Sequence, residues 1–380
     1  MACSFAGDSH CALGCGSQAA LTKPAEKNNS SSESLKLGDP APRPARVVWE
    51  TTQACDLNCV HCRVNSRPHR HPLELSTAEA FHLIDQVSAL KVPTFEMTGG
   101  DPLKRPDILP IVQYAARRGV ITALTPSTTP LLARDAVFNL KQGGLSRLAL
   151  SLDASTAELH DGFRGAPGSY KRTLDAVGWC HGADLPVQVN TTISRRNFAD
   201  LDNLIQLLTK LRVTVWSVYF LVPTGRGKLE DLLSAEEHEQ VFAKLYETSK
   251  RAKFQIKINE GQHYRRFVLQ QKVKEGPEKL EEGLGAARTT NGKGFAFVSH
   301  TGEVYPSGFL PLSAGNILWE PLADIYQHAP LFRSLRDPAQ LKGKCSRCEF
   351  KEVCGGSRAR AYAVSHDPLA EEPRCAYIPA

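Results

Sequence analysis

The sequence lacks the features that mark a membrane or secreted protein. No apolar run reaches about 18 residues, the length that a membrane-spanning helix needs, and no basic segment followed by an apolar stretch stands at the N-terminus. The eleven cysteines lie in clusters at short spacings and do not form a spread disulfide framework. These absences predict a cytoplasmic protein without membrane association, in a reducing compartment where clustered cysteines bind metal.

A one-sided charge pattern is also missing. The formal net charge is +6 at pH 7, and the 46 Lys and Arg residues are scattered among 40 Asp and Glu residues. Pairs such as Arg117-Arg118 and Arg195-Arg196 are more typical of solvated helix faces or anion contacts than of a nucleic-acid-binding stripe. The composition therefore argues against a nucleic-acid partner, and it suits a small substrate that carries carboxylate or phosphate groups.

The length of 380 residues predicts two or three domains. Residues 1–44 are rich in Ser, Ala, Gly, Pro and Lys and show no sustained apolar period, so we expect a disordered N-terminal arm. Cys3, Cys11 and Cys15 lie in this arm. Because an unstructured segment does not easily position three thiolates, free thiols are favoured over a further metal site.

From residue 46 the chain alternates strand-like and helix-like segments. Ser76 and Glu79 form a capping box that begins one of the helices. Repeated strand-then-helix units predict parallel strands with right-handed crossovers, and they place chemistry in the loops after the strands. The predicted strands cover residues 47–50, 94–98, 121–124, 147–152, 186–192 and 213–221.

Cys55, Cys59 and Cys62 follow the first predicted strand in a C-x3-C-x2-C motif. Three thiolates can bind three irons of a [4Fe-4S] cube and leave the fourth iron open, because ordinary cubane ligation needs four thiolates. A zinc knuckle or a trio of reduced core thiols is the alternative.

This motif, with His61 just before the last cysteine, resembles that of the radical S-adenosylmethionine (SAM) superfamily. The resemblance implies an α/β fold with a partial (β/α)6 barrel at residues 45–233 and a flavodoxin or ferredoxin-type electron donor. It implies that the open iron chelates SAM and that an electron from the cluster cleaves SAM to a 5′-deoxyadenosyl radical, which abstracts hydrogen from the substrate. His61 is expected near the adenine.

Two further motifs carry the resemblance. Gly99, Gly100 and Asp101 resemble the superfamily's Gly-Gly-Glu-Pro motif, whose backbone receives the SAM amino group, although Asp101 replaces the commoner Glu. Ser151 and Asp153 stand in a Ser-Leu-Asp run that resembles the one contacting SAM ribose and carboxylate.

Three other residues complete the expected SAM site. Arg164 is expected to pair with the SAM carboxylate, and a surface ion pair with Asp161 is the alternative. Ser127 and Asn190 are expected to point towards the barrel mouth. The Gly-rich run at residues 222–227 lacks the spacing of a P-loop, and the resemblance places it near the adenine.

A second cysteine set stands near the C-terminus with the spacing C-x2-C-x5-C-x20-C. Its members are Cys345, Cys348, Cys354 and Cys375. Four thiolates can bind every iron of a second, auxiliary [4Fe-4S] cluster, and a structural zinc ribbon is the alternative. We expect a helical connection at 234–290 and a small α+β domain of SPASM/twitch type at 291–380, in which Ser307 replaces a usual cysteine.

The C-terminal cysteine spacing most resembles that of the haem d1 and alternative haem biosynthesis proteins. The sequence therefore predicts a radical SAM enzyme that modifies a tetrapyrrole side chain. A peptide-modifying SPASM maturase and a non-catalytic iron-sulfur electron carrier are the alternatives, and no catalytic residue is identified. Candidate contacts to propionates and to a porphyrin iron are Arg265, Arg266, Arg358 and Arg360, and His69, His71, His263 and His300.

Overall fold

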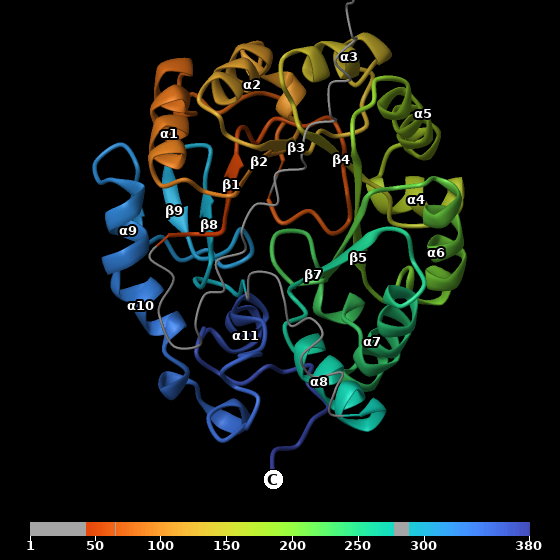
Figure 1. Ribbon diagram of the computed structural model, residues 1–380, viewed down its shortest axis with the longest axis vertical. Coiled ribbons are helices and arrows are strands. Elements are labelled where there is room, and N and C mark those ends of the chain that lie inside the picture. Colours follow the sequence, from red (N-terminus) through yellow and green to blue (C-terminus); the bar gives the residue numbers. More distant parts are fainter. Residues whose placement is uncertain (1–42, 65, 277–288) are drawn as a thin grey trace, which may run out of the picture. The chain divides into compact units, whose positions relative to one another are not determined.

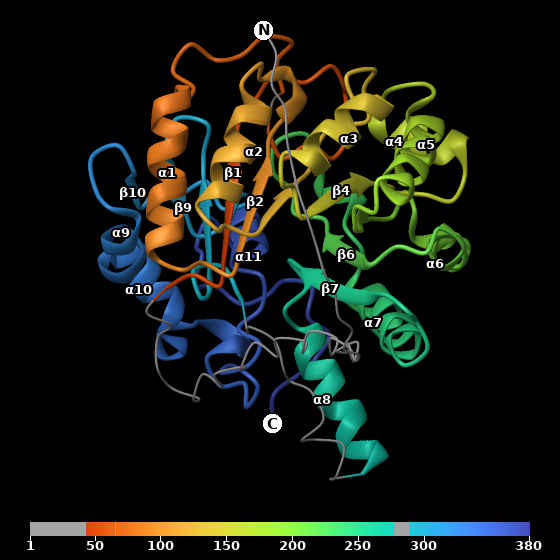
Figure 2. The same cartoon turned by 45° about the horizontal axis from the view of Figure 1, so that its top comes forward.

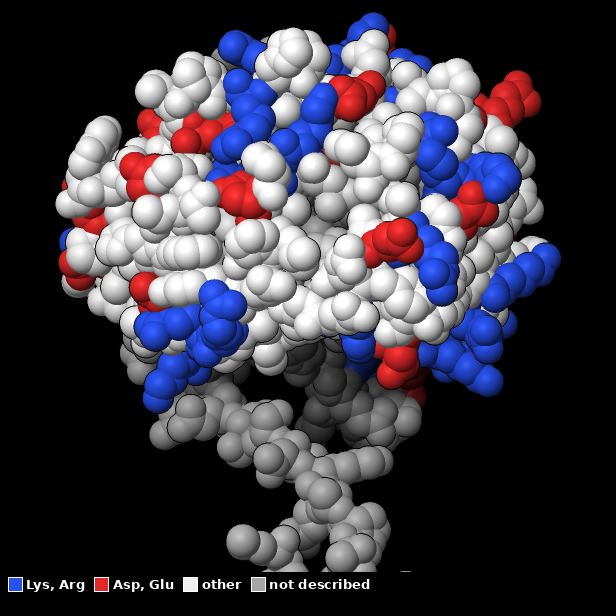
Figure 3. All heavy atoms as spheres, turned by 90° about the horizontal axis from the view of Figure 1, so that it is seen from above, with Lys and Arg blue, Asp and Glu red and all other residues white. Residues whose placement is uncertain are grey.

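The computed structural model describes residues 43–64, 66–276 and 289–380. Nearly all of the predicted N-terminal arm, with Cys3, Cys11 and Cys15, lies outside these residues. Within the described residues, no helix is both long enough and apolar enough to cross a membrane. On the face seen in Figure 3, basic groups lie in several separate places with acidic groups between them.

Six strand-helix units form the first part of the fold, as predicted (Figure 1). The strands are β1 (Arg46–Glu50), β2 (Thr94–Thr98), β3 (Thr122–Leu124), β4 (Arg147–Ser151), β5 (Val187–Ile193) and β6 (Val215–Phe220). The helices are α1 (Thr77–Ala89), α2 (Ile108–Arg117), α3 (Arg134–Gln142), α4 (Ala157–Arg164), α5 (Ser169–Gly182), α6 (Leu201–Lys210) and α7 (Ala235–Ser249).

The remaining elements extend this arrangement. They are β7 (Gln255–Asn259), α8 (Tyr264–Glu275), β8 (Phe295–Val298), β9 (Glu303–Tyr305), β10 (Gly315–Asn316), α9 (Leu322–His328), α10 (Pro330–Arg336) and α11 (Arg358–Ser365). One sheet runs in the order β10-β9-β8-β1-β2-β3-β4-β5-β6-β7. The pairs from β8 through β1 to β7 are all parallel, and β8-β9 and β9-β10 are antiparallel.

The hydrophobic core lies between the strands and the helices that cover their outer side (Figure 2). Helix α1 shows why: its capping box, formed by Ser76 and Glu79, starts the helix, and Leu83, Ile84 and Val87 are fully buried along one side. Residues on the opposite faces of the strands point inward and are more polar. The helical layer therefore leaves the strand interior available for a site.

Two predictions about residues beyond 233 need correction. The segment 234–290 is not only helical, because β7 lies within it and pairs in parallel with β6. The predicted boundary at 290 does not interrupt the sheet, since β8 pairs in parallel with β1. The charged residue Lys257 in β7 hid the strand pattern, and β8 also pairs with β9 in an antiparallel hairpin.

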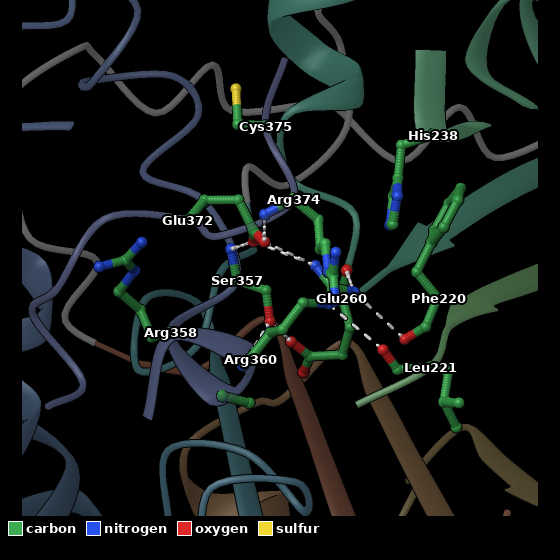
Figure 4. A network of polar contacts seen from close by, with 12 residues as sticks. Phe220, Leu221, His238, Glu260, Ser357, Arg358, Arg360, Glu372, Arg374 and Cys375 are labelled. Atoms are coloured by element: carbon green, nitrogen blue, oxygen red, sulfur yellow. Dashed lines mark hydrogen bonds and ion pairs between the residues drawn. The ribbon is translucent and has the colours of Figure 1, made fainter. Parts of the chain in front are cut away.

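A buried guanidinium connects the end of the barrel to the C-terminal segment (Figure 4). Arg360, on α11, donates to the carbonyl oxygens of Phe220, Leu221 and Glu260 at the ends of β6 and β7. Its Nη1 lies 3.0 Å from a carboxylate oxygen of Glu372, which is also buried. Burial alone would raise the pKa of Glu372, but Arg360 together with His263 and the Ser357 amide outweighs burial and lowers that pKa to about 2.

We predict that Arg360→Leu lowers the free energy of unfolding by about 3–5 kcal/mol, because it leaves the Glu372 carboxylate buried without its cation. Urea unfolding measures this change. The control is Arg333→Leu on α10, an exposed arginine, for which we expect a change within about 0.5 kcal/mol. Equal stability of the two variants would show that the buried pair does not hold the C-terminal segment.

Candidate functional site

The three cysteines of the first motif line one cavity of about 250 Å³. Cys55, Cys59 and Cys62 lie in the loop after β1, at the carboxyl end of the parallel strands. The loop is held by its backbone, since Cys55 N donates to Arg67 O at 2.8 Å and Asp101 N donates to Ala54 O at 2.6 Å. Burial raises the pKa of the Cys55 and Cys59 thiols.

The Gly99-Gly100 turn after β2 packs directly against this loop. Gly100 N donates to Thr52 O at 2.7 Å. A Cβ added at Gly99 would lie 2.5 Å from Thr52 O, and one at Gly100 would lie 2.4 Å from Ala54 O. The two glycines are therefore required by the close approach of two backbones, and both line the cavity.

The side chain of Asp101 lies outside the cavity that the neighbouring glycines line. Its carboxylate is fully buried and does not line the cavity. It accepts hydrogen bonds from Leu103 N, Ser127 N and Thr129 Oγ1, the last at 2.8 Å. Asp101 thus fixes the turn after β2 relative to the loop after β3.

Ser127, Ser151 and Asn190 line the same cavity as the cysteines. Ser127 Oγ donates to Gly100 O at 2.8 Å and lies 3.3 Å from Cys55 Sγ. The loops after β2 and β3 and the ends of β4 and β5 therefore supply one continuous polar wall beside the cysteine trio.

Arg164, at the end of α4, lines the cavity, but its partner in the structure was not foreseen. Arg164 Nη2 lies 2.5 Å from Asp153 Oδ2, and Nη1 lies 3.8 Å from Cys59 Sγ. Asp153 is fully buried and does not itself line the cavity. The alternative partner, Asp161, instead accepts from Gly168 N and Tyr170 N.

His61 stands between Cys59 and Cys62 and faces the cavity. Its ring centroid lies 4.4 Å from that of Phe163, and its buried Nδ1 has no hydrogen-bond partner among the described residues. Burial lowers the pKa of His61 well below its ordinary value, and Arg164 and Arg226 add to this shift. The ring is therefore neutral, and its unpartnered Nδ1 is available for a hydrogen bond with a ligand.

The loop at residues 222–227 clamps the cysteine loop, a role that the sequence did not reveal. Arg226 Nε donates to Cys59 O at 2.7 Å, and Arg226 N donates to Cys62 O at 2.8 Å. Gly225 has a φ of +60°, and a Cβ there would lie 2.3 Å from Cys62 O. The Thr-Gly-Arg order after β6 was the available signal for this contact.

The four C-terminal cysteines line a second, smaller pocket. Backbone amides point at two of the sulfurs, since Gly356 N donates to Cys354 Sγ at 3.3 Å and Glu372 N donates to Cys345 Sγ at 3.4 Å. Burial raises the pKa of Cys354 to about 12.

Ser307 lines the first cavity and does not face the C-terminal cysteines. Its hydroxyl donates to Glu260 Oε1 at 2.9 Å, and Asn291 Nδ2 donates to the same oxygen at 2.8 Å. Glu260 is a buried, cavity-lining residue with a φ of +53°, and sequence reasoning missed it because it lies just beyond the unrecognised β7.

The four arginines suggested as propionate contacts form hydrogen bonds or ion pairs within the protein. Arg358 donates to Ala370 O, Arg265 to Val353 O, and Arg266 pairs with Glu239, while Arg360 forms the buried pair described above. None of them lines the first cavity. The suggested histidines, His69, His71, His263 and His300, do not line the first cavity either.

Comparison with known proteins gives the class of this chain. Residues 49–208 match the Radical SAM superfamily. The chain is 43% identical over 340 residues to the "AdoMet-dependent heme synthase" of Methanosarcina barkeri, with 88% of this chain and 97% of that protein covered. It is 29% identical over 348 residues to the "Fe-coproporphyrin III synthase" of the same organism, with 87% of each chain covered.

Among solved structures, Streptococcus suis SuiB bound to S-adenosylmethionine has a TM-score of 0.69 at 17% identity, over 88% of this chain and 78% of that chain. At this identity the likeness shows the fold alone. The chain belongs to the radical SAM superfamily. It is an enzyme, and membership implies a [4Fe-4S] cluster and SAM.

We predict that Gly100→Ala removes the iron held by the first cysteine set, because the new Cβ displaces the loop that carries Cys55. Iron counts per chain and titration with SAM measure this loss. The matched control is Gly178→Ala in α5, where an added Cβ meets nothing within 4 Å. We expect the control to keep its iron and to gain about 0.5–1 kcal/mol of stability. An unchanged iron count in Gly100→Ala would contradict the packing argument.

Proposed function

We propose that this enzyme uses SAM-derived radical chemistry to modify side chains of a haem-precursor tetrapyrrole. The observation that carries the proposal is the cavity itself. Its lining includes a polar set, namely the cysteine trio, the Gly99-Gly100 turn and the polar strand ends, and an aromatic set, namely Tyr219, Phe295 and Phe309. A cofactor site and an aromatic surface suited to a flat macrocycle therefore share one space.

The polar set fits the cofactors that the superfamily implies. Cys55, Cys59 and Cys62 would bind a [4Fe-4S] cluster, which together with SAM supplies an electron and a 5′-deoxyadenosyl radical. The Gly99 and Gly100 backbones and His61, whose Nδ1 has no partner among the described residues, would bind SAM. The remaining SAM contacts proposed here are Ser127, Ser151, Arg164 and Asn190, with Asp101 and Asp153 fixing their positions.

The aromatic set supports the choice of substrate. The aromatic residues Phe297 and Phe309 line the same cavity as the cysteine loop, and Arg63, the residue after Cys62, lies over the Phe297 ring at 4.5 Å while pairing with Glu50. Relatives whose names concern haem and Fe-coproporphyrin III cover nearly the whole chain. A tetrapyrrole is therefore favoured over a peptide, which remains the alternative substrate.

The C-terminal cysteines complete the proposal. Cys345, Cys348, Cys354 and Cys375 would bind an auxiliary [4Fe-4S] cluster, and residues 291–380 would form its SPASM/twitch-like region. The backbone amides aimed at Cys345 and Cys354 suit thiolate ligands. A flavodoxin or ferredoxin-type protein in the cytoplasm would supply electrons to the enzyme.

We predict that the reconstituted enzyme, incubated with SAM, dithionite and iron coproporphyrin III, produces 5′-deoxyadenosine and a porphyrin of changed mass. The reason is that the cysteine trio and the aromatic set share the cavity. Mass spectrometry detects both products. The control replaces Cys55, Cys59 and Cys62 by Ala and should lose both products while keeping about half of the roughly eight irons expected from two cubanes.

Three outcomes of this experiment would each change a different part of the proposal. A porphyrin of unchanged mass together with modification of a candidate peptide would favour the peptide maturase. Deoxyadenosine from the triple variant would contradict the assignment of the SAM site. Zinc in the C-terminal site of the triple variant would make that site structural.

A separate prediction concerns Cys375→Ser. This change should weaken or shift the spectroscopic signal of the auxiliary cluster, and it should reduce substrate turnover much more than uncoupled SAM cleavage, because Cys375 does not line the SAM cavity. Electron paramagnetic resonance with and without SAM measures the clusters. A SAM-induced change at the C-terminal cluster that survives loss of the first trio would reverse the roles of the two sites.

A further inference from the structure

Four charged side chains gather inside the sheet at the end opposite the cysteine loop. We call Arg46, Glu96, Arg147 and Lys257, from β1, β2, β4 and β7, the barrel-floor cluster. Arg46 pairs with Glu96, and Arg147 Nη2 lies 3.7 Å from Glu96 Oε1. Arg46 and Glu96 line the large cavity that holds the cysteine trio at its other end, whereas Arg147 and Lys257 are not among the residues that line it.

This cluster carries more positive than negative charge. Three cations face the single carboxylate of Glu96, and among the described residues no acceptor or carboxylate pairs with the Lys257 ammonium. Burial lowers the pKa of Lys257, Arg147 and Arg46 lower it further, and Glu96 opposes them. The other groups that face the cluster are neutral, namely Tyr219 and Asn259.

Two donor atoms in the cluster also lack partners. Arg46 Nε and Arg147 Nε are buried, and neither forms a hydrogen bond with any residue of the described ranges. Unpaired buried donors and excess buried charge both cost free energy unless a ligand satisfies them. A carboxylate suits such a place, because guanidinium groups bind planar carboxylates through two hydrogen bonds.

From these contacts we infer that the barrel-floor cluster binds a carboxylate of the tetrapyrrole substrate at the end of the cavity opposite the SAM site. This inference rests on the proposed function. The five residues of β1 separate the floor from the cysteine loop by about 13 Å. A macrocycle whose side-chain carboxylate lies on the floor thus extends past Phe295 and Tyr219 towards the SAM site.

The geometry near Arg46 supports this placement. The Arg46 guanidinium lies over the Phe295 ring at 5.6 Å, and Arg46 Nη1 lies 3.3 Å from Asn259 Oδ1. These contacts fix one guanidinium face beside the aromatic set. Lys257, two residues before Asn259 on the same strand, points to the same side of β7 and adds a mobile cation next to that face.

The test changes Lys257 to Met, which removes the charge and keeps an unbranched side chain. The dissociation constant of iron coproporphyrin III is measured by absorbance titration of the reconstituted enzyme, and that of the tetramethyl ester, which has no free carboxylate, is measured in parallel. We expect Lys257→Met to bind the acid about tenfold more weakly than the wild type and to bind the ester equally. The matched control is Lys253→Met, an exposed lysine before β7, which should bind both porphyrins as the wild type does.

Iron content and urea unfolding show whether Lys257→Met folds, and we expect no loss of stability because an unpaired charge is removed. As a second variant, Lys257→Gln keeps a polar group and should also weaken binding of the acid alone. Equal binding of the acid by the wild type and both variants overturns the inference and leaves the proposed function standing. Failure of the wild type to bind either porphyrin overturns the proposed function, and the inference falls with it.

Discussion

The guanidinium of Arg360 is the interaction on which the arrangement of the two cysteine sets depends. It joins the carbonyl ends of β6 and β7 to Glu372, whose backbone amide donates to Cys345 Sγ. A buried ion pair gives little net stability compared with apolar residues of the same volume. Its effect here is positional, because the carbonyls of Leu221 and Glu260 accept from a donor that only one placement of α11 supplies (Figure 4).

The same network reaches the large cavity. Glu260 accepts a hydrogen bond from Ser357, which lies three residues after Cys354. It also accepts hydrogen bonds from Ser307 and Asn291, which line the cavity. Ser357 N in turn donates to Glu372 at 2.7 Å. A continuous chain of hydrogen bonds therefore joins the C-terminal segment to the lining of the cavity.

Local sequence patterns predicted much of the fold and only part of the site. The first six strands and the capping box of α1 follow from periodicity and short-range hydrogen bonds, and the loop cysteines follow from their spacing. The pairing of β8 with β1 could not be predicted from local patterns, because it joins residues some 250 positions apart in the sequence. The ion pair between Arg164 and Asp153 was missed for the same reason, since it depends on how α4 returns to the end of β4.

The missed strand β7 explains both the missed residues and the character of the interior. In a closed barrel, side chains of alternate strands fill the centre as an apolar core. Here the inward positions carry Asn190 on β5, Tyr219 on β6 and Asn259 on β7, while the apolar side chains point outward to the helices. A charged side chain at an inward strand position is costly unless something binds there. Lys257 therefore did not suggest a strand, and its segment was predicted to be a charged helical connection. A polar interior in a sheet that does not close, because its edge strands β7 and β10 do not pair, is therefore the feature of this fold that makes room for a substrate beside the cysteine trio.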